Sequence, residues 1–118
     1  MKKIYYLSTC STCKRIIKEL GLNASKVTMQ DIKVEKITGH QLDSLKAMAG
    51  SYEKLFSRVA MKYKSLGLKD KKLSETDYRR YILEEYTFLK RPVIVVGSQV
   101  FVGNAKSAVE AAKVALNA

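Results

Sequence analysis

The two cysteines of the chain form the motif Cys10-Ser11-Thr12-Cys13, which comes soon after the apolar run Ile4–Leu7. This order predicts a buried strand that leads into a cysteine loop, and a helix that begins at the loop. The start of a helix presents backbone N–H groups and the positive end of its dipole to Cys10. Both favour the thiolate, which is the reactive form of cysteine. Cys13 lies one helical turn further on the same face, close enough to form a disulfide with Cys10.

The N-terminal part of the chain has the pattern of a strand–helix–strand unit. We expect a strand at 3–7, then a helix at 12–20 that keeps its apolar residues on one face and stops at Gly21. A second strand is expected at 27–32. Because a crossover through one helix joins parallel strands, these two strands should pair in parallel.

The middle of the chain, about 38–90, has helical periodicity. A first helix should begin after Thr38, which forms a capping box with Gln41. A second should begin at Ser51 and a third at Ser74. The apolar residues expected on the core faces of the three helices are Leu42, Leu45 and Met48, then Leu55, Phe56 and Val59, then Tyr78, Ile82, Leu83 and Tyr86.

The period changes again near the C-terminus. Two short apolar runs at 93–96 and 99–102 predict a hairpin with the glycine-first turn Gly97-Ser98. Asn104 is expected to cap a final, alanine-rich helix.

The elements therefore run β-α-β, a helical block, then β-β-α. With the cysteine pair after the first strand, this order predicts an α/β protein with the three-layer thioredoxin-like fold. Its sheet should be mixed and four-stranded, with a helical insert at about 38–90. A chain of 118 residues should form one domain over 1–118. The fold alone does not give a function.

Charge and hydropathy narrow the classes of partner. The formal net charge is +11, and the lysines are spread along the chain without a nucleic-acid motif. We therefore favour a solvated surface over a nucleic-acid face, with a preference for acidic partners. No apolar run approaches the roughly 20 residues of a membrane span, and the N-terminus leads into a strand rather than a signal peptide. A cytoplasmic protein without a membrane partner is expected, in which a disulfide would be catalytic or sensory.

Five segments spread over nearly the whole chain match one known family. They are Tyr6–Lys14, Leu55–Ser57, Tyr63–Leu68, Arg91–Val95 and Val102–Gly103. In this combination the chain resembles the arsenate reductase family, which includes the Spx-type transcription regulators. The resemblance is specific because the cysteine motif occurs together with the tyrosine-leucine-glycine segment and the arginine-proline strand.

The resemblance implies a role for three residues. Cys10 matches the family nucleophile, and Arg91 matches the arginine beside the active site. Pro92 matches the proline that is cis in thioredoxin-like folds and places backbone opposite the cysteine.

The chain departs from the arsenate reductases at several positions. Ser57 and Gly103 stand where two further oxyanion-binding arginines are expected, and Tyr6 stands where those reductases have a histidine. They usually carry a single cysteine in this loop. Cys13 instead matches the Spx-type regulators, in which the cysteine pair senses oxidation. Those regulators usually extend further past the last helix than Ala118, which counts against this identification.

Several residues around the loop allow two interpretations. Lys14 could stabilise the thiolate or face water, with equal weight, and Arg15 is expected to face water. Arg91 could hold an anion or thiolate, or pair with a helix carboxylate such as Glu84 or Glu85, and the family motif favours the first. The residues expected to surround the thiolate or a bound oxyanion are Ser11, Thr12, Lys14 and Pro92.

No metal or organic cofactor is expected. A zinc site needs about four ligands, and only His40 and carboxylates could join the two cysteines. The chain contains no dinucleotide, P-loop or haem motif.

The leading hypothesis is a thiol-disulfide oxidoreductase of the arsenate reductase family. Cys10 would attack a disulfide or an oxyanion such as arsenate, and Cys13 would resolve the adduct. The incomplete arginine set argues against arsenate. Glutathione, glutaredoxin or thioredoxin would return the protein, expected to be a monomer, to the dithiol. The competing hypothesis is an Spx-type regulator that binds RNA polymerase, and a third is a binding module with a vestigial thiol pair.

Overall fold

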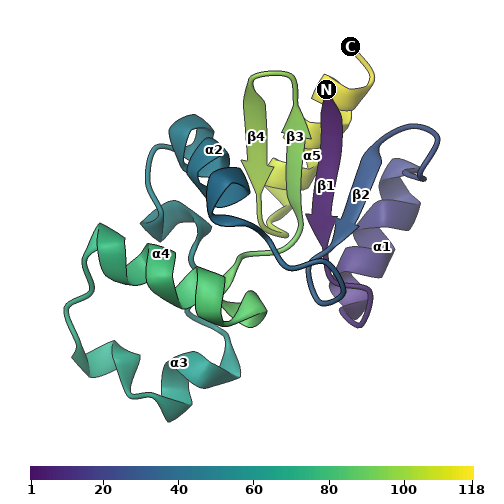
Figure 1. Ribbon diagram of the computed structural model, residues 1–118. Coiled ribbons are helices and arrows are strands. Elements are labelled where there is room, and N and C mark those ends of the chain that lie inside the picture. The colour runs from purple at the N-terminus through teal and green to yellow at the C-terminus, as the bar shows by residue number, and fades with distance from the viewer. The chain divides into compact units, whose positions relative to one another are not determined.

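The computed structural model describes residues 1–118, which fold into four strands, five α-helices and three one-turn 3₁₀ helices (Figure 1). The chain divides into two compact units, formed by 1–35 with 91–118 and by 36–90. None of the helices is both long and apolar enough to cross a membrane. The first unit contains β1 (Lys2–Tyr6), α1 (Ser11–Leu20), β2 (Thr28–Asp31), β3 (Val93–Val96), β4 (Gln99–Val102) and α5 (Lys106–Leu116). The second contains α2 (Gly39–Ala49), α3 (Met61–Ser65), α4 (Glu75–Glu84) and the 3₁₀ helices Glu53–Leu55, Leu68–Asp70 and Tyr86–Phe88.

The first unit is built on a mixed sheet with the strand order β2-β1-β3-β4. β1 pairs in parallel with β2, as the strand–helix–strand pattern predicts, and Tyr6 lies opposite Asp31 at the end of the ladder. β1 and β3 are antiparallel, as are β3 and β4, which confirms the predicted hairpin. The turn works because Gly97 adopts a φ of 62°, a left-handed conformation that costs glycine little.

One face of this sheet is covered by both helices of the first unit. Ile4 of β1 and Ile94 of β3 are opposed in the ladder and form a buried cluster with Val27 and Ala112. Burying one large aliphatic side chain on folding stabilises the folded state by about 1.5–3 kcal/mol. The partly buried side chains packed against this cluster include Ile17 and Leu20 of α1, Phe101 of β4 and Leu116 of α5.

The ends of these helices agree only in part with expectation. α1 stops at Gly21, as predicted, because that residue adopts φ 64° and donates its N–H to the carbonyls of Ile17 and Lys18. The predicted cap of α5 is wrong by one residue. Ala105, rather than Asn104, occupies the cap position, and no side chain closes the first turn. The exposed Asn104 belongs to the loop that leads into the helix.

In the second unit, two of the three predicted helices are confirmed. The Thr38 side chain accepts the Gln41 N–H at 3.0 Å and the Gln41 side chain accepts the Thr38 N–H at 3.1 Å, so α2 opens with a complete capping box. Ser74 and Asp77 form the equivalent box at the start of α4. Tyr86, expected on the apolar face of that helix, lies beyond its end in a 3₁₀ turn.

The predicted helix from Ser51 is wrong. Only Glu53–Leu55 forms a single 3₁₀ turn, after which Phe56 adopts an extended conformation and pairs with Leu89 in an isolated β-bridge. The cause is the tertiary packing of Phe56. Phe56 is buried against the rings of Tyr63, Tyr78 and Phe88, with the Phe88 ring stacked at a centroid distance of 5.0 Å. Burial of this ring overrides the helical period, and Val59, expected in the core, is 92% exposed.

Candidate active site

Cys10 occupies the N-cap position of α1, the junction that the sequence predicts. Its backbone is extended, with φ −92° and ψ 114°, and its carbonyl accepts the Lys14 N–H at 3.1 Å as the first bond of the helix. The Cys10 N–H donates to the Leu7 carbonyl at 3.0 Å, which fixes the turn between β1 and α1. The half-buried Cys10 therefore stands over the first turn of a helix, where free N–H groups favour negative charge.

The surroundings of Cys10 stabilise its thiolate. Burial acts to raise the Cys10 pKa, but hydrogen bonds from the Cys13 backbone, the Cys13 thiol, the Thr12 backbone and the Arg91 side chain outweigh it and lower the pKa below its ordinary value. A cysteine with a lowered pKa and partial exposure has the properties of a nucleophile.

Cys13 has the opposite character. It is fully buried, and burial is the main cause that raises its pKa to about 11. Its hydrogen bond to Cys10 and the negative charge of that thiolate act in the same direction, whereas a backbone hydrogen bond with Leu7 and the charge of Arg91 oppose them. The pair thus consists of an accessible cysteine whose thiolate form is favoured and a buried cysteine whose thiol form is favoured.

Arg91 and Pro92 complete this environment from the start of β3, the strand that lies beside β1. The Arg91–Pro92 peptide bond is cis, as the resemblance implies. Arg91 precedes β3, whose first residue, Val93, pairs with Tyr5 of β1, and its side chain hydrogen-bonds to Cys10. The Pro92 carbonyl accepts the N–H of Gly103 at 2.9 Å, which ties the loop after β4 to the same place.

The other predicted residues around the thiolate lie on the first turns of α1. Thr12 contributes through its backbone, as described. Ser11 and Lys14 are exposed to solvent. Arg15 forms an exposed ion pair with Glu19 one turn on, at 3.6 Å, which agrees with the expectation that it faces water.

The positions at which the chain departs from the arsenate reductases are accounted for structurally. Ser57 is buried in the second unit, where its N–H donates to the Phe88 carbonyl at 2.7 Å. Gly103 adopts a φ of 88°, a conformation in which any larger residue would be strained. Tyr6 is half-buried at the end of β1. None of the three supplies a cation.

Asp31 is a residue near the site that the sequence analysis missed. Burial is the largest single influence on its pKa and raises it, but hydrogen bonds from the Ser8 side chain, the Lys33 backbone and the Ser8 backbone together outweigh burial and lower the pKa overall. Asp31 thereby anchors the residue two positions before Cys10. The signal was available, since Asp31 ends a strand parallel to β1, and the carboxyl ends of parallel strands meet at one edge of a sheet.

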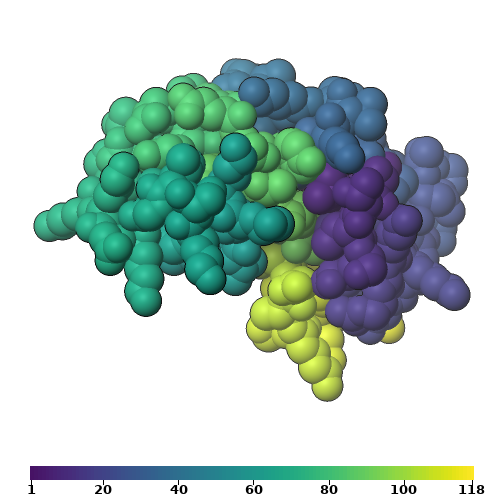
Figure 2. Space-filling model, turned by 90° about the horizontal axis from the view of Figure 1, so that it is seen from below, coloured from purple at the N-terminus to yellow at the C-terminus, as the bar shows by residue number.

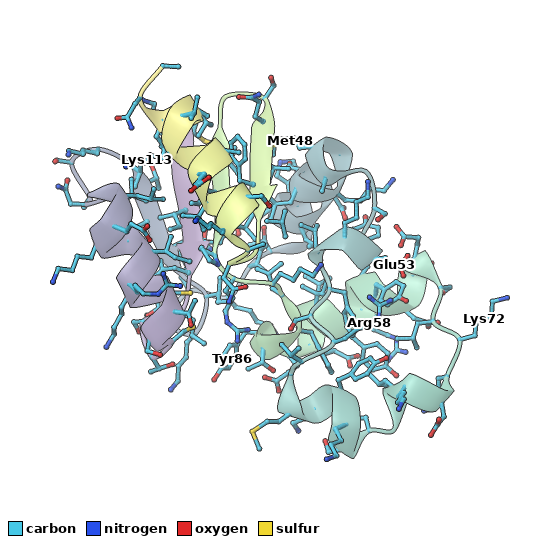
Figure 3. The ribbon with its side chains drawn as sticks, turned by 180° about the vertical axis from the view of Figure 1, so that it is seen from behind. Met48, Glu53, Arg58, Lys72, Tyr86 and Lys113 are labelled. Atoms are coloured by element: carbon cyan, nitrogen blue, oxygen red, sulfur yellow. The ribbon has the colours of Figure 1, made fainter.

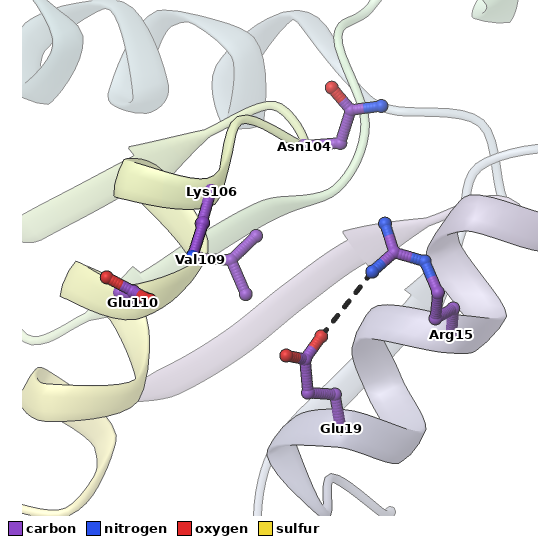
Figure 4. A pocket seen from close by; sticks show the side chains of 6 residues that line it. All are labelled: Arg15, Glu19, Asn104, Lys106, Val109 and Glu110. Carbon is purple, nitrogen blue, oxygen red and sulfur yellow. Dashed lines mark ion pairs between the residues drawn. The ribbon is translucent and has the colours of Figure 1, made fainter.

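A cavity of about 280 Å³ lies between α1 and α5 in the first unit (Figure 4). Figure 4 shows the Arg15–Glu19 pair on one wall and Lys106, Val109 and Glu110 on the other. Neither cysteine lines this cavity, so it is separate from the thiol pair. No group of three or more His, Cys, Asp or Glu side chains is arranged to hold a metal ion.

Comparison with known proteins gives a consistent result. Residues 5–112 match the ArsC family. The chain is 28% identical to the uncharacterised protein YusI of Bacillus subtilis over 102 aligned residues. This alignment covers 84% of this chain and 86% of YusI. An ArsC family related protein from Bacteroides fragilis superimposes with a TM-score of 0.79 at 24% identity, covering 94% of this chain and 96% of that one. An arsenate reductase from Vibrio cholerae superimposes with a TM-score of 0.73 at 18% identity, covering 92% of both chains. These likenesses confirm the predicted thioredoxin-like α/β fold.

Proposed function

Because the chain belongs to the ArsC family, we propose that it is a thiol-disulfide oxidoreductase in which Cys10 attacks the substrate and Cys13 resolves the adduct. The observation that carries the proposal is the opposite shift of the two cysteine pKa values, lowered at Cys10 and raised to about 11 at Cys13. A nucleophile must be a thiolate before the substrate arrives, whereas a resolving cysteine should stay protonated until it is needed.

In the first step the Cys10 thiolate attacks one sulfur of a substrate disulfide. A bond forms between Cys10 Sγ and that sulfur, the substrate S–S bond breaks, and the second substrate sulfur leaves as a thiolate that takes up a proton. The Arg91 guanidinium, hydrogen-bonded to Cys10, stabilises the negative charge before it is transferred.

The second step follows from the loss of charge at Cys10. In the mixed disulfide Cys10 no longer carries the charge or the acceptor site that raise the Cys13 pKa, so Cys13 loses its proton more readily. Its thiolate attacks Cys10 Sγ, forms the Cys10–Cys13 disulfide and expels the other half of the substrate as a thiol after protonation. A reductant of the glutathione, glutaredoxin or thioredoxin class then supplies two electrons and two protons to restore the dithiol.

The test is a coupled assay in which oxidation of NADPH reports turnover of a small disulfide, with each of the three reductant systems. We expect activity in the wild type, none in Cys10→Ser, and loss of multiple turnover in Cys13→Ser. Lys18→Ala, an exposed cation on the same helix, is the matched control and should keep full activity. Full activity of Cys10→Ser would overturn the proposal.

The same coupled assay can test arsenate as an alternative substrate. Arg91 is the one cation that supports an oxyanion at Cys10, since Ser57 and Gly103 offer none. We therefore propose disulfides rather than arsenate as the substrate class. Arsenate turnover as fast as disulfide turnover would contradict this choice.

A redox-responsive regulator of the Spx type is the second candidate, and the presence of Cys13 in the loop supports it. Its partner would be RNA polymerase, and the Cys10–Cys13 disulfide would change the affinity. Binding of purified polymerase to the dithiol and disulfide forms tests this candidate. Equal binding, or none, in both forms would remove it.

A further inference from the structure

The segment from Arg58 to Leu66 exposes more apolar surface than a solvated loop needs. Val59 is 92% exposed, Met61 is 89% exposed and Leu66 is 47% exposed. The chain has six exposed large apolar side chains, and these are three of them within eight residues. Exposed apolar residues scattered singly are ordinary, but a contiguous group indicates an interaction surface.

This segment is held in place by the core of the second unit. Ala60, between the two most exposed residues, is buried, and the Tyr63 ring packs edge-on against Phe56 at a centroid distance of 6.0 Å. Arg58 bonds Glu53 at 2.7 Å and the Tyr78 hydroxyl at 3.0 Å, and Figure 3 shows Arg58 and Glu53 side by side. The exposed side chains therefore stand on an ordered scaffold, which reduces the entropy lost when a partner binds.

Val59 and Met61, the two most exposed of these apolar residues, line one hollow of about 500 Å³ that is largely apolar. Its lining consists of Arg58, Val59, Ala60, Met61, Lys64 and Ser65. The volume lies within the range of about 300–1,000 Å³ that is typical of ligand pockets. Side chains of this segment, in teal, stand out from the surface in Figure 2. A hollow of this kind accepts one or two apolar side chains that protrude from a partner.

Charge in the segment that lines the hollow, and in the residues that follow it, is mostly positive. Residues 58–72 contain six of the 22 basic residues of the chain and only one of its 11 acidic residues, Asp70. Lys62 and Lys64 are exposed and form no ion pair, whereas Arg58 is neutralised in part by Glu53. Lys72 points away from the ribbon in Figure 3. An apolar contact bordered by unpaired cations complements an apolar segment bordered by carboxylates.

From these observations we propose that residues 58–66 form a docking surface for a partner protein that presents a short acidic segment with large apolar side chains. The apolar side chains occupy the hollow beside Val59 and Met61. The carboxylates lie against Lys62 and Lys64, where they raise the association rate and select against basic partners. The surface contains no cysteine, so this proposal stands independently of the thiol chemistry.

Two other classes of partner fit the surface less well. Single-stranded nucleic acid binds through aromatic platforms, and the one aromatic residue of the segment, Tyr63, is half-buried and packed against Phe56. A lipid surface is engaged by a long amphipathic helix, whereas α3 has only five residues. Both classes are therefore included in the test as competitors.

The experiment measures binding of a short fluorescent peptide, in which glutamates alternate with leucine and phenylalanine, by anisotropy. Two control peptides replace either the apolar residues with serine or the glutamates with lysine. The same titration is made with a single-stranded oligonucleotide and with vesicles of phosphatidylglycerol and phosphatidylcholine. Amide chemical shifts of the labelled protein locate the contact.

We expect the acidic apolar peptide to bind best and to shift the amides of residues 58–66. Val59→Ser combined with Met61→Ser should weaken binding at least about tenfold, since each side chain loses its burial. Lys62→Gln combined with Lys64→Gln should slow association and flatten its salt dependence. Val34→Ser combined with Val114→Ser, at side chains 83% and 72% exposed in the first unit, is the matched control and should bind normally.

Three outcomes would overturn the proposal. The peptide could fail to bind, or it could bind equally well to the variant at Val59 and Met61. Tighter binding of the oligonucleotide or of the vesicles than of the peptide would assign the surface to another class of partner. Equal binding by Cys10→Ser is expected in every case, which separates this result from the fate of the proposed oxidoreductase.

Discussion

The Cys13 thiol donates a hydrogen bond to the Cys10 sulfur, and this contact acts on the two pKa values in opposite directions: it helps to lower the Cys10 pKa and adds to the effect of burial in raising the Cys13 pKa. The donor is fully buried and the acceptor is half-buried at the start of a helix. The two cysteines of one motif therefore differ in acidity for reasons that their spacing alone does not give.

Removing the Cys13 donor should reduce the reactivity of Cys10. In Cys13→Ala the hydrogen bond is lost, and because one such bond contributes about 1 kcal/mol, the Cys10 pKa should rise and the ratio of thiolate to thiol at a given pH should fall about fivefold. In Cys13→Ser the hydroxyl keeps a donor, so the fall should be smaller. The rate of alkylation by iodoacetamide as a function of pH measures both. Equal rates for alanine and serine would show that the hydrogen bond is not the cause.

Arg91 should matter more to Cys10 than any other cation of the loop. Arg91→Met removes both a donor and a charge, and hydrogen bonds to charged groups contribute about 1.5–3 kcal/mol, so the Cys10 pKa should rise and the ratio of thiolate to thiol at a given pH should fall roughly tenfold or more, as alkylation across a pH range measures. Lys14→Met is the matched control, because Lys14 is a nearby cation that faces solvent. A larger effect at Lys14 than at Arg91 would show that Lys14, rather than Arg91, stabilises the Cys10 thiolate.

Asp43 should give the protein a pH-dependent stability in acid. Hydrogen bonds from Arg79 at 2.8 Å and from the Tyr52 hydroxyl at 2.6 Å lower the Asp43 pKa to about 2. A carboxyl whose pKa is lower in the folded than in the unfolded chain stabilises the fold above the unfolded value, about 3.9, and this contribution is lost as the pH falls through about 2.

Urea unfolding of wild type and Asp43→Asn across this range measures the effect. The wild type should lose more stability than the variant between neutral pH and pH 2. Glu110→Gln, which changes an exposed carboxylate without an ion pair, should follow the wild type. Parallel curves for wild type and Asp43→Asn would contradict the assignment.

The packing of Phe56 should make it one of the costliest positions in the second unit. Phe56→Ala leaves a cavity among three aromatic rings and should destabilise the fold by about 3–5 kcal/mol. Val59→Ala, at an exposed side chain, should change the free energy of unfolding by less than about 0.5 kcal/mol. Urea titration at neutral pH checks both variants. A large loss of stability in Val59→Ala would show that Val59 is buried, as the helix predicted from the periodicity requires.

Local signals predict most of the fold. The strand–helix–strand unit, the stop at Gly21, the capping boxes at Thr38 and Ser74, and the hairpin turn at Gly97 each depend on a few neighbouring residues. Such features can be predicted from the sequence because their hydrogen bonds form within the segment itself.

The predictions that the structure contradicts lie where residues distant in the sequence determine the conformation. Phe56 leaves the helical pattern because the Leu89 backbone pairs with it in an isolated β-bridge and the Phe88 and Tyr78 rings surround its side chain. The same principle limits the prediction of the site. The motif and the resemblance predict Cys10, Cys13 and Arg91 as site residues, but the position of Asp31 near them depends on how β2 lies beside β1.

The most direct test of the central claim is the reaction of purified protein with one equivalent of a small aromatic disulfide, followed by mass spectrometry and thiolate release. The wild type should release two thiolates and lose two hydrogens as Cys10–Cys13 closes. Cys13→Ser should release one thiolate and retain the other half of the reagent on Cys10, and Cys10→Ser should react far more slowly than either. If Cys10→Ser instead forms an adduct on Cys13 as fast as the wild type reacts, then Cys10 is not the nucleophile and the proposed division of roles is wrong.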